Sequence, residues 1–106
     1  MPRYVYDRPQ LPAHVEASID ALGSAARLAI LAALRGTGPA TADELAEATR
    51  MGARTIRRHL DALEALGAVT GDEPPDARHG RRTTYALQVD RVQAMYRDLG
   101  TFLGMV

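Results

Sequence analysis

Residues 55–69, "TIRRHLDALEALGAV", decide how this chain is interpreted. Successive residues of an α-helix are rotated by about 100°, so Leu60 and Leu63 fall within about 40° of Ile56 on a helical wheel. An apolar stripe of this kind must face the core of a folded domain. A glycine then stops the helix, and the hydrophobic period changes beyond it. The stretch therefore predicts an amphipathic helix over residues 53–66.

Three arginines occupy the other side of this helix, in its first two turns. They fall at about 100°, 160° and 200° from the apolar stripe (Arg57, Arg54 and Arg58). Arginine can donate two parallel hydrogen bonds to O6 and N7 of guanine, or hold a phosphate. Outward arginines are more often only a solvated surface, and Arg57 could pair with Asp61 one turn on. The neighbouring segments bear on this choice.

The residues before this helix have the pattern of a helix-turn-helix unit. "TADE" at 41–44 is a capping box, in which Thr41 caps a short helix and Glu44 reaches back to the cap. "RMG" at 50–52 then makes a tight connection to the long helix. A helix with outward arginines that follows such a turn is typical of a recognition helix, which enters the DNA major groove.

Two more helices are expected before this unit, and a hairpin and one helix after it. The first helix begins at Pro12, and the second, rich in alanine and leucine, is capped by Ser24. The runs "AVTG" and "TTYAL" are short and β-branched or aromatic, so residues 69–87 are predicted to form a β-hairpin with a long tip. Asp90 is expected to cap the last helix.

The predicted fold is mainly α with a small β-hairpin wing, a winged helix-turn-helix with about five helices. The 106 residues suffice for one core, which we assign to residues 12–106 behind an N-terminal arm over 1–11. The absence of cysteine excludes disulfides and thiolate metal sites. The longest apolar run, "LAILAAL", is too short to span a membrane, and the arm has no apolar signal core. We expect a cytoplasmic protein without a metal or other cofactor.

Charge is distributed unevenly along the chain. The formal net charge is zero, and all 13 basic residues other than histidine are arginine. Seven of the arginines fall in the middle of the chain, at positions 50, 54, 57, 58, 78, 81 and 82. A basic surface is therefore expected there, although the whole-chain charge indicates no partner.

Taken in order, these segments resemble the ArsR-like winged helix-turn-helix repressors. The resemblance lies in "ALGSAARLAILAAL" at 21–34, "TADELAEAT" at 41–49, "ARTIRRHLDALEALGAV" at 53–69 and "GRRTTYAL" at 80–87. It implies a homodimer that binds operator DNA and represses transcription. It also implies that helix 53–66 reads the major groove and that hairpin 69–87 is the wing.

The resemblance extends to individual side chains. The recognition helix would present to bases or phosphates Ala53, Arg54, Thr55, Arg57 and Arg58. His59, at the edge of the buried face, would pack or contact a phosphate. The wing would bring to the DNA backbone or minor groove Arg78, His79, Arg81 and Arg82.

The chain departs from the family at both of its metal sites. Many members bind metal through cysteines at the start of the helix-turn-helix, where this chain has Thr41 and Asp43. The second family site needs a D-x-H start on the last helix, but Asp90 is followed by Val92, and no histidine lies beyond His79. Neither metal site is therefore expected here.

Two apolar stripes remain that a three-helix core cannot easily cover. The first helix, together with the residue before it, carries Leu11, Val15, Ile19 and Leu22, and the last helix carries Met95, Leu99, Phe102 and Val106. We expect both stripes to pair with the same helices of a second copy, giving a two-fold dimer. The alternative is that both helices fold back onto their own domain.

Catalysis is not expected. His14, His59 and His79 lie on three separate segments, and no nucleophile–base pattern or phosphate-cradling glycine loop occurs. The rival to DNA binding is a winged-helix docking or dimerisation module that does not touch DNA. The zero net charge and the three acids in the wing tip "DEPPDARHG" favour this rival, whereas the arginines of helix 53–66 oppose it.

Overall fold

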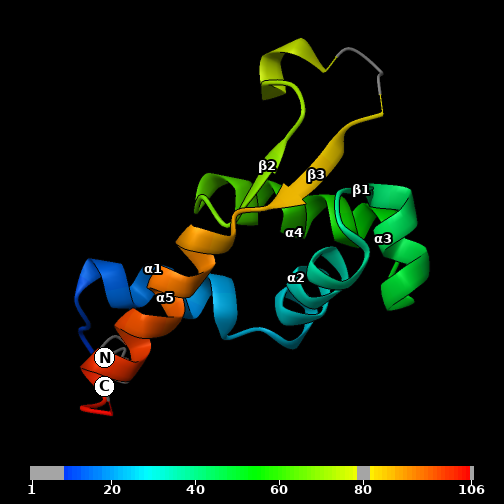
Figure 1. The fold of residues 1–106 in the computed structure, drawn as a ribbon. Coiled ribbons are helices and arrows are strands. Elements are labelled where there is room, and N and C mark those ends of the chain that lie inside the picture. Colours follow the sequence, from blue (N-terminus) through cyan, green and yellow to red (C-terminus); the bar gives the residue numbers. More distant parts are fainter. Residues whose placement is uncertain (1–8, 79–81, 106) are drawn as a thin grey trace, which may run out of the picture.

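The computed structural model describes residues 9–78 and 82–105, and it has the predicted winged helix-turn-helix arrangement (Figure 1). In chain order the elements are α1 (Ala13–Leu22), α2 (Ala25–Thr37), β1 (Ala40–Thr41), α3 (Ala42–Thr49), α4 (Ala53–Ala65), β2 (Val69–Gly71), the 3-10 turn η2 (Pro75–Ala77), β3 (Thr84–Leu87) and α5 (Val89–Phe102). Three helices, α2, α3 and α4, gather around the sheet. The β2–β3 hairpin stands out from this body as the wing.

The caps predicted for α2 and α3 are confirmed. The Ser24 side chain accepts a hydrogen bond from the Arg27 amide at 3.3 Å. At α3, the Glu44 amide donates to Thr41 Oγ1 and the Thr41 amide donates to Glu44 Oε1, which completes the capping box. Each cap satisfies amides that would otherwise lack a partner in the first helical turn, so these residues fix where the helices begin.

The sheet has three antiparallel strands in the order β1-β3-β2. Val69 of β2 pairs with Leu87 of β3, as the hairpin prediction requires. The sequence did not indicate β1, whose two residues pair with Tyr85 and Thr84. Two residues carry no periodic pattern, and β1 exists only because β3 offers it a free edge.

The prediction that Asp90 caps the last helix is wrong. Gln88 is the N-cap residue of α5 and makes no side-chain cap bond, while Asp90 lies inside the first turn. The cause is the strand before it, because the Gln88 amide still donates to the carbonyl of Ala68, so the ladder runs directly into the helix. At its actual position Asp90 favours the helix through its charge near the positive end of the dipole.

The core forms where α4 meets α2, α3 and the sheet. Ile56, Leu60 and Leu63 of α4 are fully buried, as the wheel predicts. The other large side chains of this cluster include Ile30, Leu34, Leu45, Val69, Tyr85 and Met95. Gly67 ends α4 with a φ of 82°, in the left-handed region where glycine carries no steric penalty. The buried stripe therefore fixes which side of α4 faces outward.

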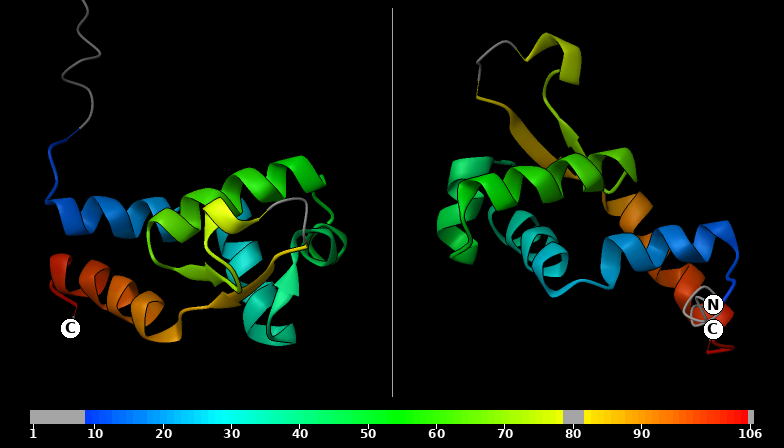
Figure 2. Two further views of the ribbon diagram at one scale, coloured as in Figure 1. Left: turned by 90° about the horizontal axis from the view of Figure 1, so that it is seen from above. Right: turned by 180° about the vertical axis from the view of Figure 1, so that it is seen from behind.

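Helices α1 and α5 lie side by side at the end of the domain away from α3 (Figure 2). Val15 and Met95 are buried there within the single chain. The two helices thus cover part of each other, although several large apolar side chains of α5 remain exposed. In the described residues, no single helix is long and apolar enough to cross a membrane, and α1 and α2 reach that length only as a pair bent by 74°.

Leu60 gives a direct test of this core. Replacing Leu60 with Ala should lower the free energy of unfolding by about 2–5 kcal/mol, since its side chain is completely buried. Leu60→Asp should prevent folding, because it would bury a charge without a partner. Thermal unfolding followed by circular dichroism measures both effects. The control Ala65→Asp, at an exposed position of the same helix, should keep a cooperative transition.

Candidate nucleic-acid interface

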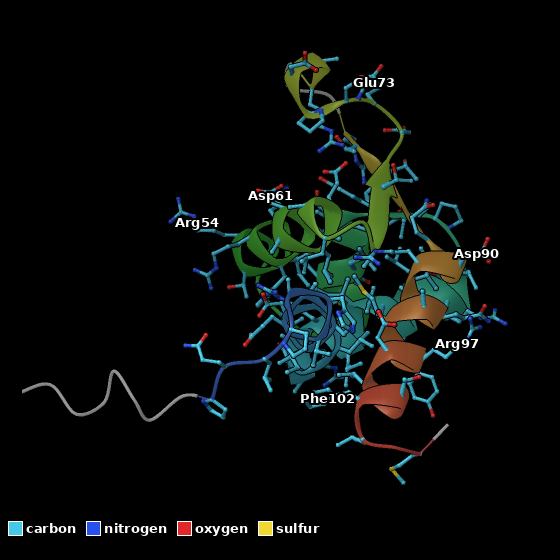
Figure 3. The ribbon with its side chains drawn as sticks, turned by 90° about the vertical axis from the view of Figure 1, so that its left-hand side faces the viewer. Arg54, Asp61, Glu73, Asp90, Arg97 and Phe102 are labelled. Carbon is cyan, nitrogen blue, oxygen red and sulfur yellow. The ribbon has the colours of Figure 1, made fainter. Side chains whose placement is uncertain are left out.

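The outer side of α4 presents unpaired arginines. Arg54 and Arg58 are exposed and, within the described ranges, make neither a hydrogen bond nor an ion pair. Figure 3 shows Arg54 directed away from the body of the domain at the start of α4. Ala53 and Thr55 are partly buried in the same turn. Gly52, the N-cap residue, provides no side-chain cap, so the first amides of α4 point outward without a partner from the cap.

Arg57, the third outward arginine, does have a partner. Its Nη2 lies 3.1 Å from Oδ1 of Asp43 on α3, and both side chains are more than half exposed. The alternative pairing with Asp61 does not occur. An exposed pair of this kind contributes little to stability, about 0–1 kcal/mol, but it holds the guanidinium over the start of α3. The pair therefore orients Arg57 rather than stabilising the fold.

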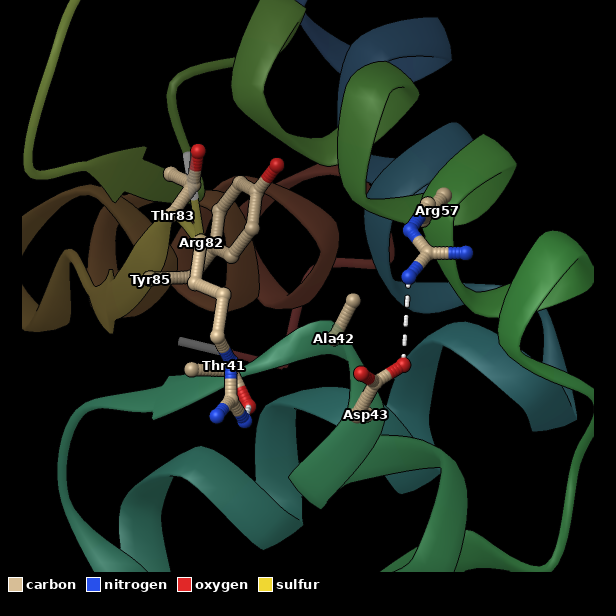
Figure 4. Close-up of a pocket in the computed structure, with 7 residues that line it drawn as sticks. All are labelled: Thr41, Ala42, Asp43, Arg57, Arg82, Thr83 and Tyr85. Carbon is tan, nitrogen blue, oxygen red and sulfur yellow. Dashed lines mark hydrogen bonds and ion pairs between the residues drawn. The ribbon is translucent and has the colours of Figure 1, made fainter. Parts of the chain in front are cut away.

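Arg57 and Arg82 face each other across a shallow pocket of about 330 Å³ between α3, α4 and β3 (Figure 4). Arg82, at the base of the wing, donates from Nη2 to Thr41 Oγ1 at 3.3 Å. The remaining lining residues are Ala42, Asp43, Thr83 and Tyr85. Two guanidinium groups and a threonine hydroxyl around one pocket can donate hydrogen bonds to a phosphate group. The negative charge of the Asp43 carboxylate in the same pocket would repel that phosphate.

His59 lies inward of these arginines. Its Nδ1 accepts a hydrogen bond from Arg27 Nε at 3.2 Å, and Arg27 Nη1 donates to the Asp20 carbonyl at 2.8 Å. Burial, and then the nearby Arg27 and Arg58 guanidiniums, lower the pKa of His59. Of its two expected roles, this geometry favours packing, since a neutral ring that accepts from Arg27 of α2 connects α4, through Arg27, to the end of α1.

Arg78, which the family resemblance places against DNA, is engaged within the protein in this structure. Its Nη1 and Nη2 donate to Glu64 Oε1 and Oε2 at 3.0 and 2.7 Å, and its Nε donates to the Glu73 carbonyl at 2.9 Å. Its guanidinium also lies 5.5 Å from the centre of the Tyr85 ring. The Arg78 side chain is only 13% exposed. Arg78 thus binds the wing to α4 instead of facing outward.

The other expected site residues differ in whether the structure describes them and in how accessible their side chains are. His79 and Arg81 of the wing, and Val106 of the expected dimer interface, lie outside the described residues. Within the expected interface, Val15 and Met95 are already buried in one chain, so a partner could not reach them. Those that remain partly or largely accessible are Leu11, Ile19, Leu22, Leu99 and Phe102.

Some exposed apolar side chains and some partners of arginines were not among the residues that the sequence indicated. Tyr96, Leu103 and Met105 are strongly exposed, and they line a groove of about 620 Å³ along the C-terminal half of α5. The helical repeat places Tyr96 and Leu103 in the same segment as the expected stripe, but it does not show that they are uncovered. Asp43 and Glu64 were missed as partners of arginines because each lies 14 residues from its arginine. Among the described residues, no three His, Asp or Glu side chains gather closely enough to hold a metal ion.

Comparison with known proteins agrees with this architecture. A family model described as a helix-turn-helix domain matches residues 22–72. A crystal structure of an ArsR family transcriptional regulator, RHA00566, superposes with a TM-score of 0.68 at 26% identity, covering 92% of this chain and 95% of that one. An ArsR-like transcriptional regulator from Rhodococcus sp. RHA1 gives 0.67 at 26% identity, with 87% and 81% covered.

A third structure shows the same fold at lower identity. The homodimeric winged helix-turn-helix DNA-binding domain of Mb0332 from Mycobacterium bovis, a possible ArsR-family regulator, has a TM-score of 0.62 at 24% identity. The match covers 86% of this chain and 79% of that one. No curated protein matches the sequence. The chain thus has a winged helix-turn-helix fold, and it is similar to ArsR-family transcriptional regulators, as the sequence predicts.

The depressed pKa of His59 predicts a pH dependence of stability. Between the folded pKa and the ordinary value of 6.5, the unfolded chain binds more protons than the folded chain, so the free energy of unfolding rises with pH. The wild-type protein should lose stability as the pH falls below 6.5. His59→Asn, whose amide oxygen can still accept from Arg27, should lose less. Urea unfolding on both sides of this pH measures the difference, and parallel losses in both proteins would contradict it.

Proposed function

We propose that the protein is a sequence-specific transcription regulator that binds double-stranded DNA as a homodimer, with α4 in the major groove and the β2–β3 hairpin as the wing. The observation that carries the proposal is the pair of unpartnered arginines, Arg54 and Arg58, on the exposed side of α4. The inner side of the helix is fully committed to the core. A helix held in this way can insert its outer face into the groove without rearranging.

Phosphate contacts would set the position of α4 on the duplex. The pocket between Arg57 and Arg82 lies at the start of α3, beside the recognition helix. A backbone phosphate in this pocket would replace Asp43 as the partner of Arg57, so the contact would position the protein without carrying sequence information.

The dimer is supported by the uncovered apolar side chains of α5. Tyr96, Phe102, Leu103 and Met105 are all about half or more exposed on one short segment. The homodimeric relative from M. bovis has the same fold. A two-fold axis through α1 and α5 would place two copies of α4 in successive major grooves, about 34 Å apart, and would require a two-fold-symmetric operator.

Of the possible effects on transcription, repression requires the fewest further contacts from such a dimer. A dimer bound across a promoter would exclude the transcription machinery and needs no additional contact with it. The protein would then act in the cytoplasm, together with the DNA that it regulates, and not as an enzyme.

A protein-docking module remains the second candidate, because the net charge is zero and the wing tip is acidic. Salt separates the two functions. DNA binding through phosphates releases counterions, so its association constant falls steeply as salt rises. A docking module would show no salt-sensitive affinity for any DNA.

Arg54→Ala and Arg58→Ala should each weaken operator binding by roughly 1–3 kcal/mol, the usual contribution of a specific base contact. The operator is first selected from random or genomic DNA fragments by the wild-type protein, and affinities are then measured by fluorescence anisotropy. Arg35→Ala removes an exposed arginine from α2 and serves as the control. Wild-type affinity in both α4 variants would mean that this face does not read DNA.

Leu103→Asp should convert the dimer to a monomer. Leu103 is 67% exposed in the single chain, so the change should leave the monomer fold intact but place a charge inside the dimer interface. Sedimentation equilibrium gives the mass, and circular dichroism verifies folding. Ala48→Asp, on an exposed part of α3, is the matched control and should remain dimeric. A dimer in both variants would place the interface elsewhere.

A further inference from the structure

The ion pair between Glu64 and Arg78 connects the recognition helix to the wing. Glu64 lies near the end of α4, and Arg78 follows the η2 turn of the wing. The two side chains form a bidentate pair at 3.0 and 2.7 Å, with exposed fractions of 20% for Glu64 and 13% for Arg78. Glu64 Oε2 also accepts from the Gly71 amide at 3.1 Å. One carboxylate therefore binds both β2 and the segment that returns from the wing tip.

Arg78 completes the connection on its other side. Its Nε donates to the carbonyl of Glu73, which closes the turn between these two residues, and its guanidinium stacks near the Tyr85 ring of β3. Each of its three nitrogens thus has a partner within the wing or α4. The hydrogen bonds from Arg78 keep the pKa of Glu64 below its usual value, so the carboxylate stays charged at neutral pH.

The wing needs such a connection because its own pairing is short. β2 has three residues, β3 has four, and β2 lies at the edge of the sheet where it pairs with β3 alone, so few ladder hydrogen bonds hold it. Bidentate arginine–carboxylate pairs are among the stronger and more directional polar contacts in proteins. A wing fixed to α4 reaches DNA in a single orientation, so less conformational entropy is lost on binding.

We propose that Glu64 and Arg78 form a wing latch that pre-positions the hairpin relative to α4 for DNA binding. The latch rests on the proposed function, and both members are positioning residues that do not touch the DNA. Glu64 thereby assists the binding of a polyanion although it is itself an anion. Arg78 assists that binding without contributing a phosphate contact.

Gly71 provides an independent sign that the latch is built into the fold. A Cβ atom added at Gly71 would collide with Arg78 Nη2 and would lie 2.9 Å from Arg78 Cζ and from Thr83 Cγ2. The guanidinium therefore occupies the space that any other side chain at position 71 would need. The two Arg78 atoms belong to the end of a flexible side chain, whereas the Thr83 methyl is on a short, branched one. Gly71→Ala should therefore displace Arg78 from Glu64 and shift Thr83 slightly, without altering the charge of the protein.

The sign of one change in affinity distinguishes the latch from simple electrostatics. Glu64→Gln removes a negative charge beside the DNA-binding surface, and charge alone predicts tighter binding. A released Arg78 could also reach a phosphate, which would strengthen binding further. The latch predicts the opposite, a loss of roughly tenfold in affinity, equivalent to about 1.4 kcal/mol. Glu47→Gln, which removes an exposed charge from α3, is the control and should not weaken binding.

Two more variants test whether the residues act as one unit. Gly71→Ala should weaken binding by a similar factor, and the double variant Glu64→Gln/Arg78→Gln should be no weaker than either single variant. The dependence of affinity on salt should keep the wild-type slope in Arg78→Gln, since no phosphate contact is lost. Tighter binding by Glu64→Gln, additive losses, or a shallower slope in Arg78→Gln would each overturn the latch.

Amide hydrogen exchange reports on the latch without DNA. Exchange at Gly71 and its β2 neighbours should accelerate in Glu64→Gln and Gly71→Ala, while exchange at the buried centre of α4 stays unchanged. Unchanged exchange in β2 would show that the pair does not hold the wing. If the wild-type protein retains no DNA from any pool, the proposed function fails and the latch loses its role in binding. Accelerated exchange in the variants would still distinguish that outcome from a failure of the wing connection itself.

Discussion

The burial of three side chains on α4 determines what the rest of this protein can do. Ile56, Leu60 and Leu63 are completely enclosed, which leaves the helix one permitted rotation about its axis. Because neighbouring residues are about 100° apart, this rotation turns Arg54 and Arg58 toward solvent. The candidate DNA-reading face is thus a geometric consequence of core packing. His59, at the edge of the buried stripe, adds a polar restraint through Arg27 that opposes rolling of the helix.

The same rotation explains why the wing can be held by α4. Glu64 is one residue beyond Leu63, so it lies at the margin of the buried face and not on the face that carries Arg54. From that margin it reaches β2 and Arg78, which are also partly buried. Helix α4 therefore has three different roles on three of its sides. It packs on the core, presents cations outward and supports the hairpin along its edge.

Sequence periodicity was sufficient for the helices and for the inner and outer sides of α4, because both depend on neighbours within one or two turns. Ser24 and Thr41 were identifiable as caps for the same reason. The failures have a different origin. β1 depends on an edge offered by β3 more than 40 residues away, and the start of α5 depends on the pairing of Gln88 with Ala68. Contacts of this kind leave no local pattern.

The roles of individual arginines could not be predicted from neighbouring residues in the sequence either. Arg78 and Arg82 have the same chemistry and belong to the same hairpin. Only the fold reveals that one is enclosed by Glu64 and Tyr85 while the other lies at the rim of an open pocket. A count of basic residues in the wing therefore does not distinguish an arginine with partners inside the protein from one at an open pocket.

The difference between arginines that pair inside the protein and arginines that stay exposed also changes what a net charge of zero implies. Exposed charges farther apart than about 8–10 Å are largely screened at physiological salt, so a phosphate at α4 senses the local arrangement and not the sum over the chain. Near α4, Asp43 and Glu64 are each engaged with an arginine, and they orient cations as well as neutralise them. Arg54 and Arg58 are left without a carboxylate partner among the described residues. The exposed Asp61 also lies on the outer side of α4, but Arg54 and Arg58 outnumber it, so an excess of positive charge is left there. The zero net charge of the whole protein is therefore a weak argument against DNA binding.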